Sequence, residues 1–150
     1  EIARVFGAKV IYYSASGAAP QDGYEQVDFD TLLAASDIIS VHAPLNEYTE
    51  NLMNREAFAK MKSSAIFLNV GRGPIVVEQD LFEALESGEL AAAGLDVLCK
   101  EPIAADNPLL QIKDSRKLLI TPHIAWASVE ARDRLVQMVL EQVQEYAKTR

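Results

Sequence analysis

An arginine between two glycines has the residue type and the setting needed to bind an anion. Arg72 follows Gly71 and precedes Gly73, directly after the apolar run 65–70. Glycines let the backbone approach a ligand closely, and a guanidinium can hold a carboxylate through two parallel hydrogen bonds. Taken alone, a Gly-Arg-Gly turn is more often a surface turn. Its interpretation therefore depends on which partners the rest of the chain supplies.

Polar residues that could be such partners follow other apolar runs. Asp96, Glu101 and His123 each come after a segment that is typical of a buried strand. In a parallel sheet the carboxyl ends of the strands lie on one edge, so these side chains can meet Arg72 there. Histidine exchanges protons near neutral pH, and a neighbouring carboxylate favours its charged form. An arginine, a histidine and a carboxylate together suit reduction of a 2-keto acid or oxidation of a 2-hydroxy acid.

Each of these residues also has an ordinary structural interpretation. His123 could be a loop histidine bonded to backbone, and Glu101 a solvated loop acid. His42 is expected to be structural because it ends a buried strand. Trp126 would ordinarily belong to a core or an interface, and Cys99 is expected to be inert. Two histidines without close ligand spacing predict no zinc site, and no nucleophile elbow is present.

Composition limits the classes of partner. The 150 residues carry a net charge of −8, which argues against nucleic acid and anionic membrane surfaces as partners. A single cysteine excludes an internal disulfide framework and fits a reducing, cytoplasmic compartment. No apolar run approaches the roughly 18 residues of a membrane span, and no signal peptide is visible. We therefore expect a cytoplasmic protein with a small-molecule substrate.

Apolar periodicity predicts strands that alternate with helices in a single domain. Such alternation is typical of an α/β fold in which helices cover both faces of a parallel sheet. Residues 1–6 resemble the last turns of a helix, so the chain is expected to begin inside one. The predicted strands are 9–13, 38–42, 65–70, 92–98 and 117–121, and the predicted later helices are 28–35, 54–61, 78–88 and 129–147, with a loop over 14–23.

Four motifs make the chain resemble the cofactor-binding domain of the D-isomer-specific 2-hydroxyacid dehydrogenases. They cover almost the whole chain, in the order and with the spacing of that family, and their combination is far more specific than one glycine motif. The motifs are residues 37–45 (DIISVHAPL), 69–73 (NVGRG), 94–97 (GLDV) leading to Glu101-Pro102, and 121–126 (TPHIAW).

The resemblance implies roles for individual residues. Arg72 would bind the carboxylate and carbonyl oxygen of the substrate. His123 would be the acid in reduction and the base in oxidation, with Glu101 paired to it, and Asp96 would contact the nicotinamide end of the cofactor. The cofactor would be NAD, because no lysine or arginine for a 2′-phosphate occurs between Lys9 and Arg55. The implied cofactor-binding residues are Ser14, Ala43, Pro44, Val70, Gly71, Arg72, Asp96, His123, Ala125 and Trp126.

The resemblance also implies what lies outside the chain. The fold would be a Rossmann-type doubly wound parallel sheet, incomplete because its first strand and glycine-rich turn would precede Glu1. Residues 1–150 would then form most of one NAD-binding domain without a substrate domain. Such a chain is expected to bind nucleotide weakly or not at all, and to be inactive alone.

For the intact protein we expect a homodimer that acts on glycerate and hydroxypyruvate or on glyoxylate. A glutamate at position 101 argues against the formate dehydrogenase branch. The alternative is a non-catalytic, dinucleotide-binding module of the same fold, like the corepressors of the family.

Overall fold

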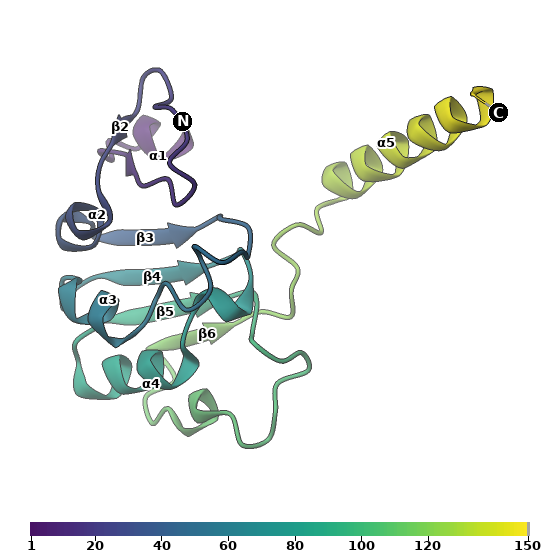
Figure 1. Cartoon of the computed structure of the whole chain (residues 1–150). Helices are drawn as coiled ribbons and strands as arrows, with labels where there is room; N and C mark the ends of the chain where they lie inside the picture. The colour runs from purple at the N-terminus through teal and green to yellow at the C-terminus, as the bar shows by residue number, and fades with distance from the viewer. Residues whose placement is uncertain (150) are drawn as a thin grey trace.

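The computed structural model describes residues 1–149, and a four-stranded parallel sheet lies at its centre (Figure 1). Its strand order is β3-β4-β5-β6, and every neighbouring pair is parallel. The register places Val41 opposite Asn69, and Asn69 opposite Leu95, so three strands end at one level. The predicted parallel α/β fold is confirmed. The strands are β3 Ile38–Val41, β4 Ile66–Asn69, β5 Ala92–Leu95 and β6 Leu118–Ile120.

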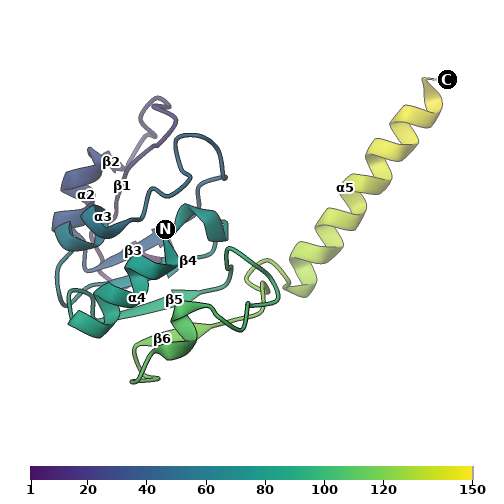
Figure 2. The ribbon, with the colours of Figure 1, turned by 60° about the horizontal axis from the view of Figure 1, so that its bottom comes forward.

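Three helices lie together on one face of the sheet: one precedes β3, one joins β3 to β4, and one joins β4 to β5 (Figure 2). They are α2 (Phe29–Ala35), α3 (Arg55–Lys60) and α4 (Glu78–Ser87). Asp28 caps α2 by accepting from the Thr31 amide, and Asn54 caps α3 by accepting from the Ala57 amide.

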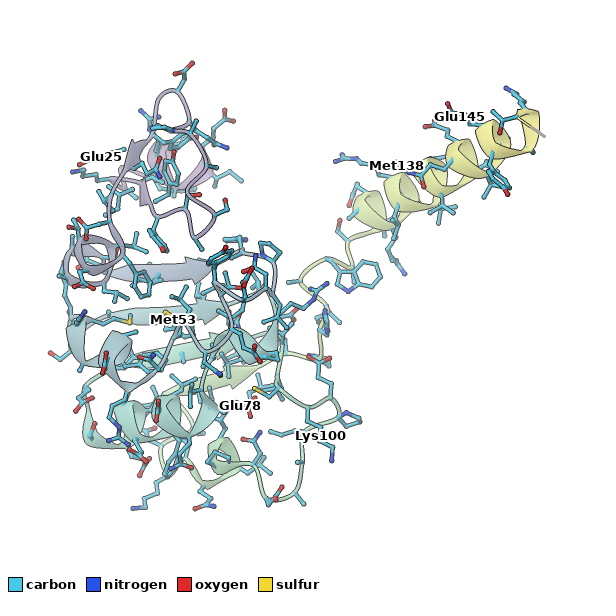
Figure 3. The ribbon with its side chains drawn as sticks, in the orientation of Figure 1. Glu25, Met53, Glu78, Lys100, Met138 and Glu145 are labelled. Atoms are coloured by element: carbon cyan, nitrogen blue, oxygen red, sulfur yellow. The ribbon has the colours of Figure 1, made fainter. Side chains whose placement is uncertain are left out.

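The core fills the space between these helices and the sheet. Phe58 of α3 and Phe67 of β4 are fully buried and meet edge to face, with ring centroids 5.6 Å apart. Met53, which precedes α3, is 1% exposed and lies inside the same layer (Figure 3). Alternate strand residues supply the sheet side of this core, because side chains of a strand point to opposite faces in turn.

The opposite face of the sheet is not covered, contrary to the expectation of helices on both faces. Ile38 is 60% exposed and Leu119 is 66% exposed on that face. The α1 helix (Ile2–Val5) lies beside the N-terminal strands, and the α5 helix (Val129–Lys148) projects away from the sheet (Figure 1). Neither helix therefore shields the second face within residues 1–149.

The N-terminal segment forms a separate two-stranded parallel sheet of β1 (Ile11–Tyr12) and β2 (Glu25–Gln26). The predicted strand 9–13 is thus only two residues long. The β2 strand was not predicted from the sequence, because two polar residues after a loop carry no alternation of apolar and polar residues.

The α5 helix confirms the predicted helix 129–147 but buries none of its residues. Ser128 caps it by accepting from the Ala131 amide. Met138 is 51% exposed on its surface, in contrast to Met53 in the core (Figure 3). None of the helices in residues 1–149 has both the length and the apolarity needed to cross a bilayer.

Candidate active site

Two adjoining clefts lie at the carboxyl ends of the central strands. The first has a volume of about 460 Å³ and the second about 370 Å³, and both are lined by Val70 and Arg72. In open parallel sheets this edge is where ligands bind. The first cleft is also lined by His42, Ala43, Pro44, Leu45 and Gly71, and the second by Asp96, His123, Ala125, Trp126 and Leu135.

The turn that carries Arg72 is shaped by the side chain of Asn69, the last residue of β4. Asn69 is fully buried; its amide nitrogen donates to the Arg72 carbonyl at 2.9 Å, and its oxygen accepts from the Gly71 amide at 3.1 Å. A Cβ at Gly71 would lie only 2.9 Å from the Ala43 carbonyl oxygen, so the turn fits tightly against the end of β3. The Asn69 side chain and the glycine at position 71 therefore determine the backbone conformation of the turn that carries Arg72.

The Arg72 side chain is exposed and has no acidic partner among residues 1–149. One guanidinium nitrogen donates to the Gly71 carbonyl at 2.8 Å. The remaining donors of the guanidinium can therefore bind an anion that enters either cleft.

Gly73 joins this turn to the loop that follows β5. It begins the short helix η1 (Gly73–Ile75), and a Cβ at this position would lie 2.0 Å from the carbonyl carbon and oxygen of Leu98. No side chain fits in such a contact. The Arg72 turn and the loop that carries Glu101 therefore pack backbone against backbone.

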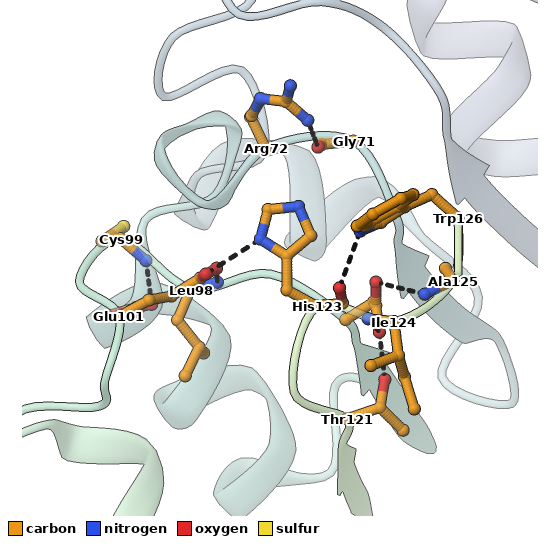
Figure 4. A network of polar contacts seen from close by, with 12 residues as sticks. Gly71, Arg72, Leu98, Cys99, Glu101, Thr121, His123, Ile124, Ala125 and Trp126 are labelled. Atoms are coloured by element: carbon orange, nitrogen blue, oxygen red, sulfur yellow. Dashed lines mark hydrogen bonds and ion pairs between the residues drawn. The ribbon is translucent and has the colours of Figure 1, made fainter. Parts of the chain in front are cut away.

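Glu101 and His123 form a hydrogen-bonded pair (Figure 4). Oε2 of Glu101 lies 2.9 Å from Nδ1 of His123, while Oε1 accepts from the Leu98 amide at 3.0 Å. The bond from Leu98 and then that from His123 hold the pKa of Glu101 below its ordinary value. A carboxylate in this place binds a protonated Nδ1. Nε2, the other nitrogen of His123, has no hydrogen-bond partner within residues 1–149 and remains available for proton transfer.

Asp96 holds the loop on which His123 lies. Its carboxylate is 6% exposed and accepts from the Thr121 hydroxyl at 2.5 Å, the Ile124 amide at 2.9 Å and the Ala125 amide at 2.8 Å. Burial alone would raise the pKa of Asp96, but these three bonds outweigh it and lower the pKa. His123 lies between Thr121 and Ile124 and has a φ of 56°, a left-handed conformation that is uncommon for residues other than glycine. Asp96 therefore stabilises the backbone that presents the imidazole.

The structure brings most of the predicted site residues together. Trp126 is 53% exposed, so it does not belong to the core, and its indole nitrogen donates to the His123 carbonyl at 3.0 Å (Figure 4). Ser14 lines neither cleft; its hydroxyl lies 3.3 Å from that of Ser16, after β1. Among residues 1–149 no three histidine, cysteine or acidic side chains are grouped as metal ligands.

The position of His42 corrects the expectation that it is a structural residue at the end of a buried strand. His42 is exposed and lines the first cleft, because β3 ends one residue earlier, at Val41. Its Nε2 lies 2.9 Å from the Ser40 hydroxyl.

Cys99 is close to the site but lines neither cleft. Partial burial and the nearby Glu78 carboxylate raise the pKa of its thiol to about 11, which disfavours the reactive thiolate.

Sequence reasoning gave no role to two residues that shape the site. Thr121 binds Asp96, and Leu135 of α5 lines the second cleft. Leu135 belongs to the apolar periodicity of α5, which indicates an amphipathic helix but not the surface that the helix meets. The bond between Thr121 and Asp96 joins residues 25 positions apart and has no local signal.

Comparison with known proteins identifies the family of this chain. The family model described as D-isomer specific 2-hydroxyacid dehydrogenase, NAD binding domain, matches residues 1–125. A hydroxypyruvate reductase of Blautia hydrogenotrophica is 47% identical over 150 residues, which are 99% of this chain and 46% of the relative. The chain thus spans about half the length of such relatives.

Solved structures show the same fold. A D-isomer specific 2-hydroxyacid dehydrogenase of Lactobacillus delbrueckii ssp. bulgaricus, in its NAD complexed form, matches with a TM-score of 0.83 and 32% identity, over 99% of this chain and 48% of that one. An acyclic imino acid reductase in complex with NADPH and D-Arg matches with a TM-score of 0.88 and 34% identity, over 99% and 46%. The chain belongs to the D-isomer specific 2-hydroxyacid dehydrogenase family and corresponds to its NAD-binding domain.

Proposed function

We propose that the intact protein is an NAD-dependent dehydrogenase that interconverts a small 2-hydroxy acid and the corresponding 2-keto acid. One observation carries the proposal: Arg72, which has no acidic partner within residues 1–149, shares a cleft with a histidine whose Nδ1 is bound by a carboxylate. The arginine suits the carboxylate of such a substrate, and the histidine suits proton exchange with its C2 oxygen.

In the proposed mechanism each residue has a separate task. Arg72 binds the substrate carboxylate and orients the keto group toward His123. During reduction Nε2 of His123 donates its proton to the keto oxygen, and during oxidation it removes the hydroxyl proton. Glu101 keeps the Nδ1 proton in place and stabilises the imidazolium before transfer.

The residues along the clefts fit a dinucleotide. Val70, Ala43 and Pro44 are apolar residues that line the first cleft, and Gly71, which has no side chain, lets the backbone come close to a ligand there. These residues would hold the cofactor together with Trp126 and Asp96, whose Oδ2 accepts one internal hydrogen bond and can accept another. When bound, the nicotinamide would supply or accept the hydride.

Hydroxypyruvate with glycerate, or glyoxylate, is the substrate class that we favour. Relatives named hydroxypyruvate reductase and glyoxylate reductase support it. We further propose that residues 1–150 are most of one NAD-binding domain, that the substrate domain lies outside them, and that the intact enzyme is a cytoplasmic homodimer.

Steady-state oxidation of NADH by the intact protein tests the function, with hydroxypyruvate, glyoxylate, pyruvate and 2-ketoisocaproate as substrates. Arg72→Ala and His123→Ala are expected to abolish turnover, whereas Arg116→Ala, which removes an exposed arginine paired with Asp114, is expected to retain it. Activity that survives both site substitutions would overturn the roles. NADH binding without turnover of any of the four acids would favour the non-catalytic module, and a strong preference for NADPH would overturn the cofactor assignment.

A further inference from the structure

We propose that Glu78 is a positioning residue, which holds the Glu101 loop in the place where Glu101 meets His123. The inference rests on the proposed function for its catalytic meaning. Glu78 is the first residue of α4, and it lines neither cleft. Its two carboxylate oxygens bind the loop after β5 at two separate points, Cys99 and Asn107.

Both contacts are hydrogen bonds of normal length, and within residues 1–149 neither donor has another partner. Oε1 of Glu78 accepts from the Cys99 amide at 2.8 Å, and Oε2 accepts from the side-chain nitrogen of Asn107 at 2.8 Å. No lysine, arginine or histidine within residues 1–149 forms an ion pair with Glu78. The charge is therefore stabilised by these donors and by the amino-terminal end of α4.

These contacts lead directly to the proton-transfer pair. Cys99 and Leu98 are neighbours; the Cys99 amide donates to Glu78, and the Leu98 amide donates to Oε1 of Glu101. Gly73 packs against the same Leu98–Cys99 peptide. A shift of this peptide would therefore move Glu101 away from His123 without a change in either of the paired residues.

Only a carboxylate satisfies both donors. The orientation of Asn107 is fixed, since its side-chain oxygen already accepts from the Leu109 amide at 2.9 Å and the residue is 6% exposed. A glutamine at position 78 would place its NH₂ group, which is itself a donor, against either the Cys99 amide or the side-chain nitrogen of Asn107. Neither of these two donors can rotate away. Glu78→Gln therefore loses a hydrogen bond although the side chain keeps its size.

The same geometry predicts a compensating substitution. In the double variant Glu78→Gln/Asn107→Asp, the new aspartate can accept from both the Gln side chain and the Leu109 amide, while the Gln oxygen accepts from the Cys99 amide. Each donor again has an acceptor, and the net charge of the pair is unchanged. Glu86→Gln is the matched control, because Glu86 lies on the same helix and accepts from the amide of a loop residue, Lys113, away from Glu101.

The experiment measures kcat, KM and the pH profile of keto-acid reduction by the intact protein. Glu78→Gln is expected to lower kcat about tenfold with little change in KM, and to move the alkaline limit of activity to lower pH, because proton transfer from His123 is impaired. The double variant is expected to recover most of kcat, and Glu86→Gln to resemble the wild type. Equal profiles for Glu78→Gln and Glu86→Gln, or a folded double variant without recovery, would overturn the proposal.

Alkylation of Cys99 by iodoacetamide, followed on the peptide that contains it, gives a readout without turnover. Burial and then Glu78 raise the pKa of this thiol to about 11, so Glu78→Gln is expected to accelerate alkylation and Glu86→Gln is not. An unchanged rate in Glu78→Gln would contradict the contact of Glu78 with this loop. If the wild type reduces no keto acid, the proposed function fails, while the alkylation rates still decide whether Glu78 holds the loop.

Discussion

One carboxylate, that of Glu101, binds both the Leu98 amide at 3.0 Å and Nδ1 of His123 at 2.9 Å. The hydrogen bond from the Leu98 amide fixes the carboxylate within its own loop. The hydrogen bond to Nδ1 then orients the imidazole of His123. Glu101 and His123 are only partly exposed, with 40% and 38% of their side-chain surfaces accessible. A charged pair in this setting is weakened by solvent, so its effect on stability is small. Its main structural effect is to fix the orientation of the imidazole ring.

Glu101→Gln is expected to lower kcat/KM for keto-acid reduction by about 10- to 100-fold, because an amide stabilises the imidazolium less than a carboxylate does. Protonated His123 is the proton donor in reduction, so the alkaline limit of the pH profile moves to lower pH. Stopped-flow measurements of NADH oxidation over a range of pH check this. A variant with the wild-type profile would show that Glu101 has no part in proton transfer.

Gly73→Ala is expected to destabilise the protein by at least about 3 kcal/mol, because the added carbon overlaps the backbone of Leu98. Gly94→Ala is a fitting control, since its added carbon meets only the end of the Leu68 side chain, 2.9 Å away, which can move. Chemical denaturation of the two variants measures the difference. Equal stability would mean that the Arg72 turn does not pack against the Glu101 loop as described.

The lowered pKa of Asp96 makes stability depend on acid pH. A carboxylate with a depressed pKa in the folded protein contributes stability above its unfolded pKa, near 3.8, and this contribution is lost as the pH falls through the folded pKa. Asp96→Asn is therefore expected to cost about 1–3 kcal/mol at neutral pH. The difference from the wild type should shrink below pH 3.8. Thermal melts across this range check it, and a gap that stays constant with pH would contradict the assignment.

The two methionines Met53 and Met138 should respond differently to truncation in the 150-residue chain. Met53→Ala is expected to cost about 2–5 kcal/mol, because the residue is 1% exposed in the core. Met138→Ala is expected to change stability by less than about 0.5 kcal/mol, because α5 buries nothing. Urea denaturation of both variants provides the measurement, and a large loss from Met138→Ala would show that α5 packs against the rest of this chain.

Strands with a clear apolar run were predictable from the sequence. A strand was predicted over residues 65–70, and β4 occupies Ile66–Asn69, one residue shorter at each end. The β2 strand was not predictable, because Glu25 and Gln26 pair with β1 through backbone bonds that need no apolar side chain. His42 was predicted to be structural at the end of a buried strand, but β3 ends one residue earlier, at Val41, and the His42 side chain is exposed.

For the site, the polar residues at strand ends located Arg72, Asp96 and His123 on one edge, and the family resemblance supplied the pairing of Glu101 with His123. The tertiary contacts of the loops could not be read from the sequence. The bonds from Ile124 and Thr121 to Asp96 depend on how two loops meet in space, and no local pattern encodes that.

Trp126 gives these loops an optical reporter. It is the only tryptophan in the 150 residues, and its indole nitrogen donates to the carbonyl of His123 itself. Indole emission depends on hydrogen bonding and on contact with solvent, so a movement of the His123 loop changes the colour and yield of the fluorescence. The emission of Trp126 therefore reports directly on the loop that carries His123, the residue proposed to transfer the proton.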